Sequence, residues 1–434
     1  MNTRITFAAV AVAIPSLLCA QDQPGATLPP LQKPGTDYRT PRAGEGFTAD
    51  LFGSPYEVQP RDRHSVSALD VGFQVTPDVS DSSFQPYASW YLFDRAPNGS
   101  EYTRALLGGI YDDVQWARKL DAHDDMEMVL GFTNYTPPYE IGEWIDGDVI
   151  DGEKLKWGYV RGRIGFGART DIGPGHPDNM SATDVFLEPG YLYFGRGDST
   201  DPSFELPDST FEMRVRLQTR HDALERNLVE RAHSGYAWGG DVIWGTRSGW
   251  STFGAPTGTG TTRGGDSRDY VIASAYFVDA MPLPFTDSER HRLVFTAHAA
   301  VSDGTDRFSA PRIGGGPDTR GEEFESIAHP VLPGAGIEEF YPEHYAIGSL
   351  TYRYEATFFA YFEAGATVAW LDRDRRRGGG IARDDDTLTS LHAMVTSGFL
   401  GQTRLQFGYA YDFDLVRDGE DGGSSFGFRI TKTF

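Results

Sequence analysis

The sequence holds one cysteine in 434 residues and none of the short motifs that mark common catalytic chemistries. Cys19 lies in an apolar run near the N-terminus, and Leu18 before it is larger than a lipoprotein signal requires. The rest of the chain therefore has to be stabilised without disulfides. There is no Gly-x-Ser-x-Gly elbow, no phosphate-binding glycine loop and no histidine pair at metal-ligand spacing. We expect no catalytic site, no metal site and no cofactor, and we interpret the protein as not an enzyme.

Long apolar runs are also missing after the first twenty residues. Residues 1–20 carry one basic residue, Arg4, followed by an apolar run from Phe7 to Ala20. This layout predicts a secretory signal peptide over residues 1–20, and the run is too short to cross a bilayer as a helix. The mean hydropathy of the chain is −0.41. Transmembrane β-barrels also give such values, because every second residue of each strand faces a wet interior.

Positive charge is scarce, since 39 lysines and arginines face 62 acidic residues and leave a net charge of −23. An acidic surface does not attract nucleic acid, so we expect no nucleic-acid partner. The acid gathers in inferred loops, for example at 143–153 and 383–386. A solvated surface is the simpler interpretation. The alternative is that divalent cations bridge these loops to anionic headgroups of outer-membrane lipids and lipopolysaccharide.

What the sequence does contain is a strong period of two. In FEMRVRLQ (211–218), apolar and polar residues alternate strictly, and in RLQFGYAYDFDL (404–415) the odd positions are all apolar or aromatic. Such segments have ten or more residues, the length that a tilted strand needs to cross a membrane. Glycine (51), tyrosine (21) and phenylalanine (28) are abundant, which suits curved strands and interfacial aromatic girdles.

The connectors between inferred strands alternate in length. Working back from the C-terminus, short turns near Gly401 and Ala356 alternate with longer segments at 371–386 and 304–343. Short turns on one side and long loops on the other are typical of outer-membrane barrels. We therefore predict an all-β protein: a transmembrane antiparallel β-barrel of about sixteen strands over residues 65–434. Residues 21–64 are rich in Pro and Gly, show no period, and are interpreted as a periplasmic tail or linker.

The chain ends on a strand with one apolar face. Phe426, Phe428, Ile430 and Phe434 share that face, and Phe434 is the last residue. A terminal aromatic on such a strand is the usual mark by which the barrel assembly machinery recognises its substrates. An ordinary edge strand is the alternative, but an exposed apolar edge is a liability in a soluble protein. We interpret these four residues as a C-terminal assembly signal.

The C-terminal half resembles the barrel of the BamA/TamA superfamily, the bacterial surface-antigen family. The resemblance covers roughly 205–434 and rests on three segments and the strand count after them. RLQTRHDALERNLVERAHSGY (216–236) is similar to a strand–turn–strand of the family, and RFSAPRIGGGPDTRGEEF (307–324) to its long sixth loop. GSLTYRYEATFFAYFEAGATVAW (348–370) is similar to the strand pair that follows, and five strands after the loop match the family's sixteen-strand barrel.

The resemblance implies that the loop between strands 11 and 12 folds back into the lumen. It implies further that Arg320, followed by Gly321, meets the acidic residue Glu363 on the thirteenth strand. Strand alternation places Glu363 and Gly365 on the lumen face, and arginine suits a carboxylate there. The alternative is that both are ordinary lumen charges. The sequence departs from the family at the loop tip and at Glu363, where aspartate is usual, and residues 21–64 are too short for one of the family's periplasmic repeats.

Three functions stay open at this point. The resemblance implies a barrel that inserts or translocates protein or lipid at the outer membrane through a weakly closed seam between its first and last strands. A passive or substrate-selective pore, with 304–343 as its constriction, is the second. A barrel enzyme is the third, for which Ser234 beside His233 is the nearest suggestion. The sequence names no protein substrate.

Overall fold

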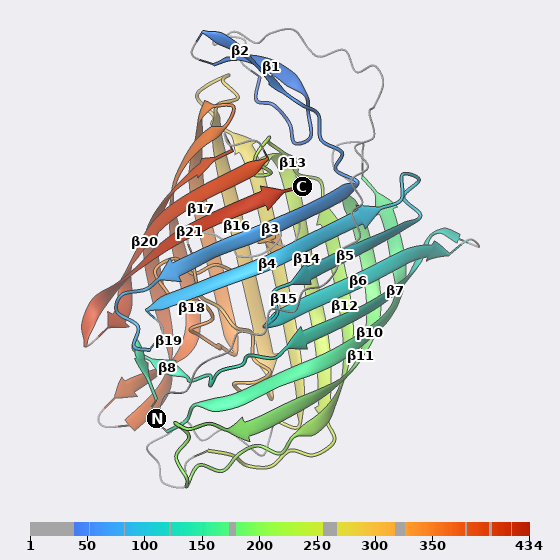
Figure 1. The fold of residues 1–434 in the computed structure, drawn as a ribbon. Coiled ribbons are helices and arrows are strands. Elements are labelled where there is room, and N and C mark those ends of the chain that lie inside the picture. Colours follow the sequence, from blue (N-terminus) through green and yellow to red (C-terminus); the bar gives the residue numbers. More distant parts are fainter. Residues whose placement is uncertain are drawn as a thin grey trace, which may run out of the picture.

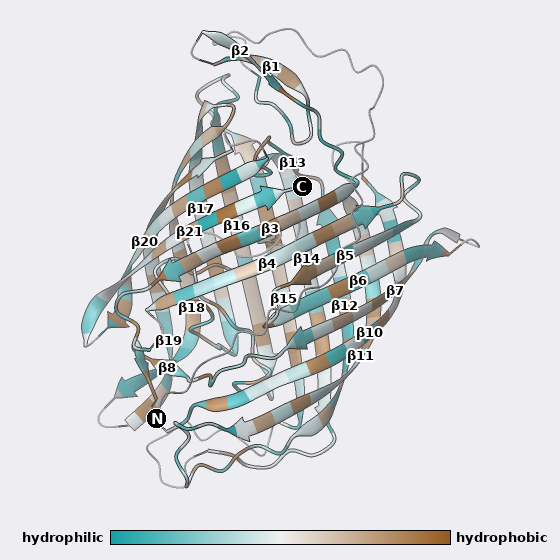
Figure 2. Ribbon diagram, viewed as in Figure 1, coloured by the Kyte–Doolittle hydropathy of each residue, from teal (hydrophilic) through white to brown (hydrophobic). Residues whose placement is uncertain are grey.

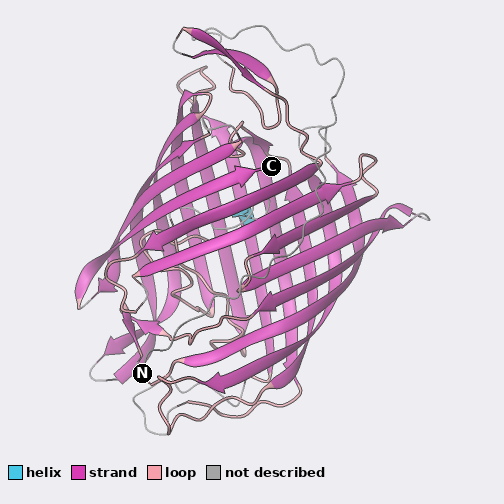
Figure 3. Ribbon diagram, in the orientation of Figure 1, coloured by secondary structure: helices cyan, strands magenta, loops and turns pink. Residues whose placement is uncertain are grey.

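A computed structural model describes residues 39–434, apart from 52, 82, 121–122, 151, 173–178, 255–266, 317–325, 378–379, 399–401 and 418. The predicted signal peptide therefore lies outside the described residues. Strands dominate the described chain (Figure 3), and the one helical segment is a single 3₁₀ turn, η1 (Ser326–Ala328). None of the helical structure in the described residues is long and apolar enough to cross a membrane.

The main feature is a closed antiparallel barrel (Figure 1). Within the described residues its wall has sixteen strands, which confirms the predicted fold class. They are β3 (Ser65–Val75), β4 (Phe84–Arg95), β5 (Glu101–Leu107), β6 (Tyr111–Leu120), β7 (His123–Tyr135), β10 (Leu155–Asp171), β11 (Met180–Arg196), β12 (Thr210–Asp222), β14 (Ala232–Arg247), β15 (Asp269–Pro282), β16 (His291–Asp303), β17 (His344–Thr357), β18 (Ala360–Arg377), β19 (Gly380–Ser397), β20 (Thr403–Arg417) and β21 (Glu420–Thr433).

Each strand follows its chain neighbour around the wall, and β21 pairs with β3 to close it. This first-to-last pairing is called the seam below. The end of the barrel at which β3 begins and β21 ends is called the terminal end, and the opposite end the loop end. In β18, Tyr361, Glu363 and Thr367 are buried while Phe362 and Val368 are about half exposed, so the predicted two faces are present.

The outward face is a hydrophobic band. Exposed large apolar side chains occur on all of the longer strands, among them Val71, Phe166, Leu217, Val368 and Phe407. Figure 2 shows hydrophobic stretches interspersed with hydrophilic residues along the strands of the wall. The inward face instead carries buried charged residues in ion pairs, such as Arg163 with Glu188 at 3.0 Å. An apolar exterior around a polar interior is the pattern that a barrel needs in a bilayer.

The predicted long loop at 371–386 is wrong. The segment 371–386 is not a long loop, because β18 and β19 stay paired from Leu371↔Asp386 to Arg377↔Gly380. Arginines of β18 face aspartates of β19 there, for example Arg373 with Asp386, and these pairs stabilise a strand pair that is mostly charged. Residues 101–120 contain the two strands β5 and β6.

Part of the predicted linker is folded. Residues 39–64, called the strap below, contain the hairpin of β1 (Phe47–Leu51) and β2 (Ser54–Val58), which lies outside the wall beyond the terminal end (Figure 1). The other small elements are the pair β8 (Trp144–Ile145) and β9 (Asp148–Val149) at the loop end, and β13 (Glu225–Arg226) beside β14.

Candidate functional site: the seam, the lumen and the terminal mouth

The seam is shorter than the other pairings of its two strands. β21 and β3 form eight register pairs, from Phe426↔Val75 to Thr433↔Ala68. β3 forms eleven pairs with β4, and β21 forms twelve with β20. The seam is not the shortest junction of the wall, because β4 and β5 share six pairs.

A buried ion pair crosses the seam on the lumen side. Nε of Arg429 in β21 lies 2.8 Å from Oδ1 of Asp70 in β3, and the hydroxyl of Thr431 donates to the same oxygen at 3.1 Å. At the end of the seam, the amide of Phe434 donates to the carbonyl oxygen of Ser67 at 2.8 Å. A single carboxylate oxygen of β3 therefore accepts from two side chains of β21 across the seam.

The predicted assembly signal lies on the outward face of β21. Phe426 and Ile430 are each 37% exposed and Phe434 is 63% exposed, while Phe428 contacts Phe73 with ring centroids 5.6 Å apart. The ring of Phe434 stacks on Trp90 of β4 at 5.6 Å and 4°. The Phe428–Phe73 contact crosses the seam toward the loop end, and the Phe434–Trp90 stack reaches β4 at the terminal end. Their role in assembly stays a prediction.

The described parts of segment 304–343, between β16 and β17, contact the wall from inside at widely separated strands. Asp306 pairs with Arg247 of β14 at 2.7 Å, and both side chains are fully buried. Glu339 accepts both ends of the Arg417 guanidinium of β20 at 2.7 Å each. The segment is therefore fixed by buried, charge-assisted bonds at two places. Its tip with Arg320 and Gly321 is not among the described residues.

The same segment contacts both strands of the seam. The side-chain amide of Gln74 in β3 donates to the carbonyl of Ala335 at 2.7 Å. The backbone amide of Gly334 donates to the hydroxyl of Ser425 in β21 at 3.2 Å. Gly334 has a φ of +97°, and a Cβ there would lie 2.7 Å from Cβ of Asp412. Only glycine fits this close approach without strain. The glycine-rich parts of the segment thus lie against the seam from within.

Glu363, the predicted acidic partner of Arg320, lies in the lumen as expected. Its two oxygens accept from Nε of Arg353 in β17 at 3.1 Å and from Nη2 of Arg231 at 3.0 Å. Gly365 also faces inward, and a Cβ there would lie 2.6 Å from the ring of His392 and 2.7 Å from the hydroxyl of Thr351. Glycine at 365 therefore leaves room for the Thr351–His392 contact at 3.1 Å. The Arg320–Glu363 contact remains a prediction.

Arg231 belongs to a turn that crosses the terminal mouth. The turn, residues 223–231, connects β12 and β14, which lie opposite the seam in the strand order. It nevertheless reaches β18 through Arg231 and β20 through the carbonyl of Val229, which accepts from Nη1 of Arg404 at 3.0 Å. We call residues 223–231 the inner turn. It covers part of the mouth rather than standing at the rim.

The strap completes the cover. The Thr40 hydroxyl donates to Glu355 at 2.6 Å and its amide to Glu289 at 2.9 Å, so the strap is tied to β17 and to the β15–β16 turn. Arg42 forms an isolated antiparallel bridge with Asn227 of the inner turn. Burial alone raises the pKa of Glu45, but hydrogen bonds from the Arg39 side chain and the Arg42 amide outweigh it and lower that pKa below its usual value.

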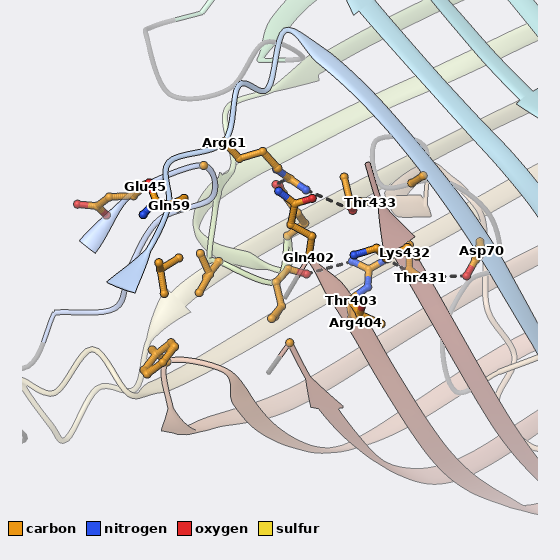
Figure 4. Close-up of a pocket in the computed structure, with 18 of the residues that line it drawn as sticks. Glu45, Gln59, Arg61, Asp70, Gln402, Thr403, Arg404, Thr431, Lys432 and Thr433 are labelled. Carbon is orange, nitrogen blue, oxygen red and sulfur yellow. Dashed lines mark hydrogen bonds and ion pairs between the residues drawn. The ribbon is translucent and has the colours of Figure 1, made fainter. Parts of the chain in front are cut away.

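The strap ends in two arginines that bind one carboxylate. Arg61 and Arg63 both form ion pairs with Glu230 of the inner turn, and Nε of Arg63 lies 3.0 Å from Oε1. Arg61 also donates to the Thr433 hydroxyl at 3.4 Å, which joins the strap to the end of β21 (Figure 4). Glu230 is 9% exposed and has a φ of +62°, a conformation that residues other than glycine rarely adopt.

Between the strap, the inner turn and the seam is a cavity of about 410 Å³. Figure 4 shows it opening between the hairpin and the ends of β20 and β21. It is lined by apolar side chains of all three parts, together with the polar groups of the seam end; they include Tyr56, Val58, Val229, Phe358, Ala68, Thr431 and Thr433. The cavity thus adjoins the seam on the terminal side.

The sequence interpretation missed the strap, the inner turn as a cover, and Glu230. A signal was present: FTADL (47–51) alternates apolar and polar residues, and Gly46 and Gly53 flank it as turn residues do. Nothing in the sequence pointed to Glu230. Among the described residues, no group of three or more His, Cys, Asp or Glu side chains could hold a metal ion.

The closed wall, the outward apolar band and the charged interior define a multi-pass β-barrel of the outer membrane. No family model matches the sequence, and no curated protein matches it. Solved structures do match. CdiB from Acinetobacter baumannii is 10% identical with a TM-score of 0.50, and the match covers 91% of this chain. The chain spans 64% of the length of that CdiB structure.

Two further structures match at a similar level. BamA from Haemophilus ducreyi lacking POTRA domains 1–3 is 10% identical with a TM-score of 0.49, and the match covers 90% of this chain and 75% of BamA. CdiB from Escherichia coli is 13% identical with a TM-score of 0.45, covering 90% and 67%. At this identity the likeness to the first CdiB concerns the fold alone. That fold agrees with the one implied by the sequence resemblance.

Proposed function

We propose that the protein inserts or translocates protein or lipid at the outer membrane, and that its substrate leaves sideways through the seam between β3 and β21. The observation that carries this proposal is the contact of segment 304–343 with both seam strands, through Gln74 and Ser425. A segment bound there from inside stands in the way of a steady aqueous path, and its release goes together with separation of the two strands.

The seam itself supports the proposal. Its eight register pairs are fewer than either strand makes on its other side, and the buried pair of Arg429 with Asp70 crosses it on the lumen side. Separation of the strands exposes backbone donors and acceptors that an incoming strand can pair with. We also propose that the barrel is itself a substrate of the barrel assembly machinery through Phe434, and that it lies among outer-membrane lipids and lipopolysaccharide.

A substrate-selective pore is the second candidate. The observation that favours it is a charged wall inside β10, β11 and β12, where Arg163, Arg214 and Arg216 all face Glu188 within 3.8 Å. Such a wall tolerates water and ions, as porin interiors do.

Conductance across a planar bilayer separates the two functions. For a gated seam we expect brief, infrequent openings, and Asp70→Asn should make them more frequent because Arg429 loses its carboxylate. Glu420→Gln, at the exposed start of β21, is the control and should change nothing. A steady conductance that is the same in all three proteins would favour the pore and count against the seam.

A further inference from the structure

We propose that the inner turn and the strap form a gate across the terminal mouth, and that Glu230 is its latch. The gate controls access from the terminal side to the cavity beside the seam. The inference rests on the proposed function for what passes, but the latch can be tested without any substrate.

The latch consists of three charged side chains from two separate segments. Glu230 lies in the inner turn, whereas Arg61 and Arg63 lie at the end of the strap, directly before β3. Glu230 and Arg63 are both buried, so the bonds between them are poorly screened and strong. Removal of the one carboxylate leaves two guanidinium groups side by side, which repel each other. Backbone bonds and the Arg42–Glu225 ion pair also join the two segments, but the pair of Arg63 with Glu230 is far more buried than that ion pair.

The backbone at Glu230 indicates that its placement is imposed by these contacts. Its φ of +62° is unfavourable for a side chain with a Cβ, and such conformations persist where the surroundings fix them. The inner turn supplies few alternatives: the Asn227 side chain accepts from the amides of Val229 and Arg231 and shapes the turn so that Glu230 points at the strap.

The gate has contacts that can part without unfolding the barrel. The strap packs on the wall through Phe47, whose ring meets Phe358 at 5.2 Å, and through Thr40. None of these contacts belongs to the sheet ladder of the wall. The strap and the inner turn can therefore separate while all sixteen strands of the described barrel stay paired.

An open gate gives access to the cavity. Ala68 of β3 is buried, faces the lumen and lines the cavity beside the seam. When the strap and the inner turn part, a solute arriving from the terminal side reaches Ala68. This residue forms the last register pair of the seam with Thr433. A substrate segment that enters there meets the seam at its end.

Cysteine labelling measures the gate directly. The full chain carries Cys19→Ser and Ala68→Cys, folds in detergent, and reacts with a small, negatively charged thiosulfonate. With the latch intact we expect slow labelling. Glu230→Gln, which keeps the shape and removes the charge, should raise the rate about tenfold or more, as the loss of charge-assisted hydrogen bonds implies. Glu212→Gln is the matched control and should leave the rate unchanged, because it removes a buried carboxylate from its pair with Arg161 at the loop end.

A disulfide provides the second arm. Arg42→Cys and Asn227→Cys join strap and inner turn at their isolated bridge, where register partners lie at disulfide distance. Oxidation should slow the labelling of Ala68→Cys below the rate of the reduced protein. Should Glu230→Gln fail to fold, this comparison tests the latch in its place. Equal rates in Glu230→Gln and its parent, or in the oxidised and reduced pair, would overturn the latch.

The two proposals fail in different ways. If the seam never opens, the labelling rates still follow Glu230 and the disulfide. If the gate is not a gate, the rates stay constant whatever the seam does. A further pair, Val71→Cys with Ile430→Cys, closes the seam and should leave the labelling unchanged, since entry is through the mouth.

Discussion

Arg353 and Glu363 face each other across a register pair of β17 and β18, with Nε of the arginine 3.1 Å from Oε1 of the glutamate. The second oxygen of Glu363 accepts from Arg231, so one buried carboxylate joins two wall strands to the inner turn. Glu363, which the sequence predicted to bind Arg320 of the loop between β16 and β17, thus binds the inner turn that covers the terminal mouth.

The first prediction concerns this carboxylate. Glu363→Gln should lower the free energy of unfolding by roughly 3 kcal/mol, because the buried Arg353 and the partly buried Arg231 lose the carboxylate that they share. The measurement is the temperature at which the heat-modifiable, folded band disappears in a gel. Glu420→Gln, exposed at the start of β21, is the control and should melt with the parent. Equal melting of the Glu363 variant would mean that water or another anion replaces the carboxylate.

The second prediction is that Arg320 shares Glu363 with Arg353 and Arg231. Arg320→Ala and Glu363→Ala should each make the loop sensitive to protease. The double variant should be little worse than Glu363→Ala alone, since that change already removes the contact that Arg320 would make. Arg353→Ala with Glu363→Ala is the positive control, because these residues are in contact. If the effects of Arg320 and Glu363 simply add while the control pair couples, the two residues do not meet.

The third prediction sets the orientation in the membrane. We expect the terminal end to face the periplasm and the loop end to face outward. A cysteine in place of Glu420, at the loop end, should react with an impermeant maleimide on whole cells. A cysteine in place of Phe285, which is 93% exposed in the β15–β16 turn at the terminal end, should react only after lysis. The reverse pattern rejects this orientation.

The fourth prediction is that Phe434 matters for assembly more than for the finished barrel. Its ring is 63% exposed and stacks on Trp90, so its loss should cost the folded barrel about 1 kcal/mol. Deletion of Phe434 should nevertheless reduce the amount of folded barrel in the membrane several-fold. Phe413→Ala, an exposed aromatic on β20, is the control and should leave the amount unchanged. Equal amounts for the two variants argue against an assembly signal.

The wall could be predicted because each strand repeats one rule. Apolar residues face lipid and polar residues face the lumen. The alternation of the two therefore predicts strands such as β12 and β20 from the sequence. The rule failed at 371–386, where both faces are charged. There the strands are stabilised by cross-strand pairs such as Arg373 with Asp386, a pattern that resembles a loop when only hydropathy is considered.

The interior could be predicted only in part. Alternation places Glu363 in the lumen, but its partners Arg353 and Arg231 come from different elements, and pairing across space leaves no period in the sequence. The same is true of Glu230, whose partners Arg61 and Arg63 are more than 160 residues away. Contacts of this kind form only once the strap and the inner turn lie together over the mouth, and the local sequence pattern does not predict that arrangement.

The central claim is that the seam between β3 and β21 opens, and a disulfide tests it most directly. Val71 and Ile430 are register partners across the seam, and both are exposed on the outer face. Val71→Cys with Ile430→Cys, in the Cys19→Ser background, should form a bridge that holds the strands together. The matched control is Val71→Cys with Ala88→Cys, which links β3 to β4 and leaves the seam free.

In cells depleted of the native protein, the outer-membrane protein profile is then measured by mass spectrometry. We predict that the seam-bridged protein fails to restore the profile until a reductant is added, while the control restores it throughout. Full restoration by the oxidised, seam-bridged protein would contradict the account.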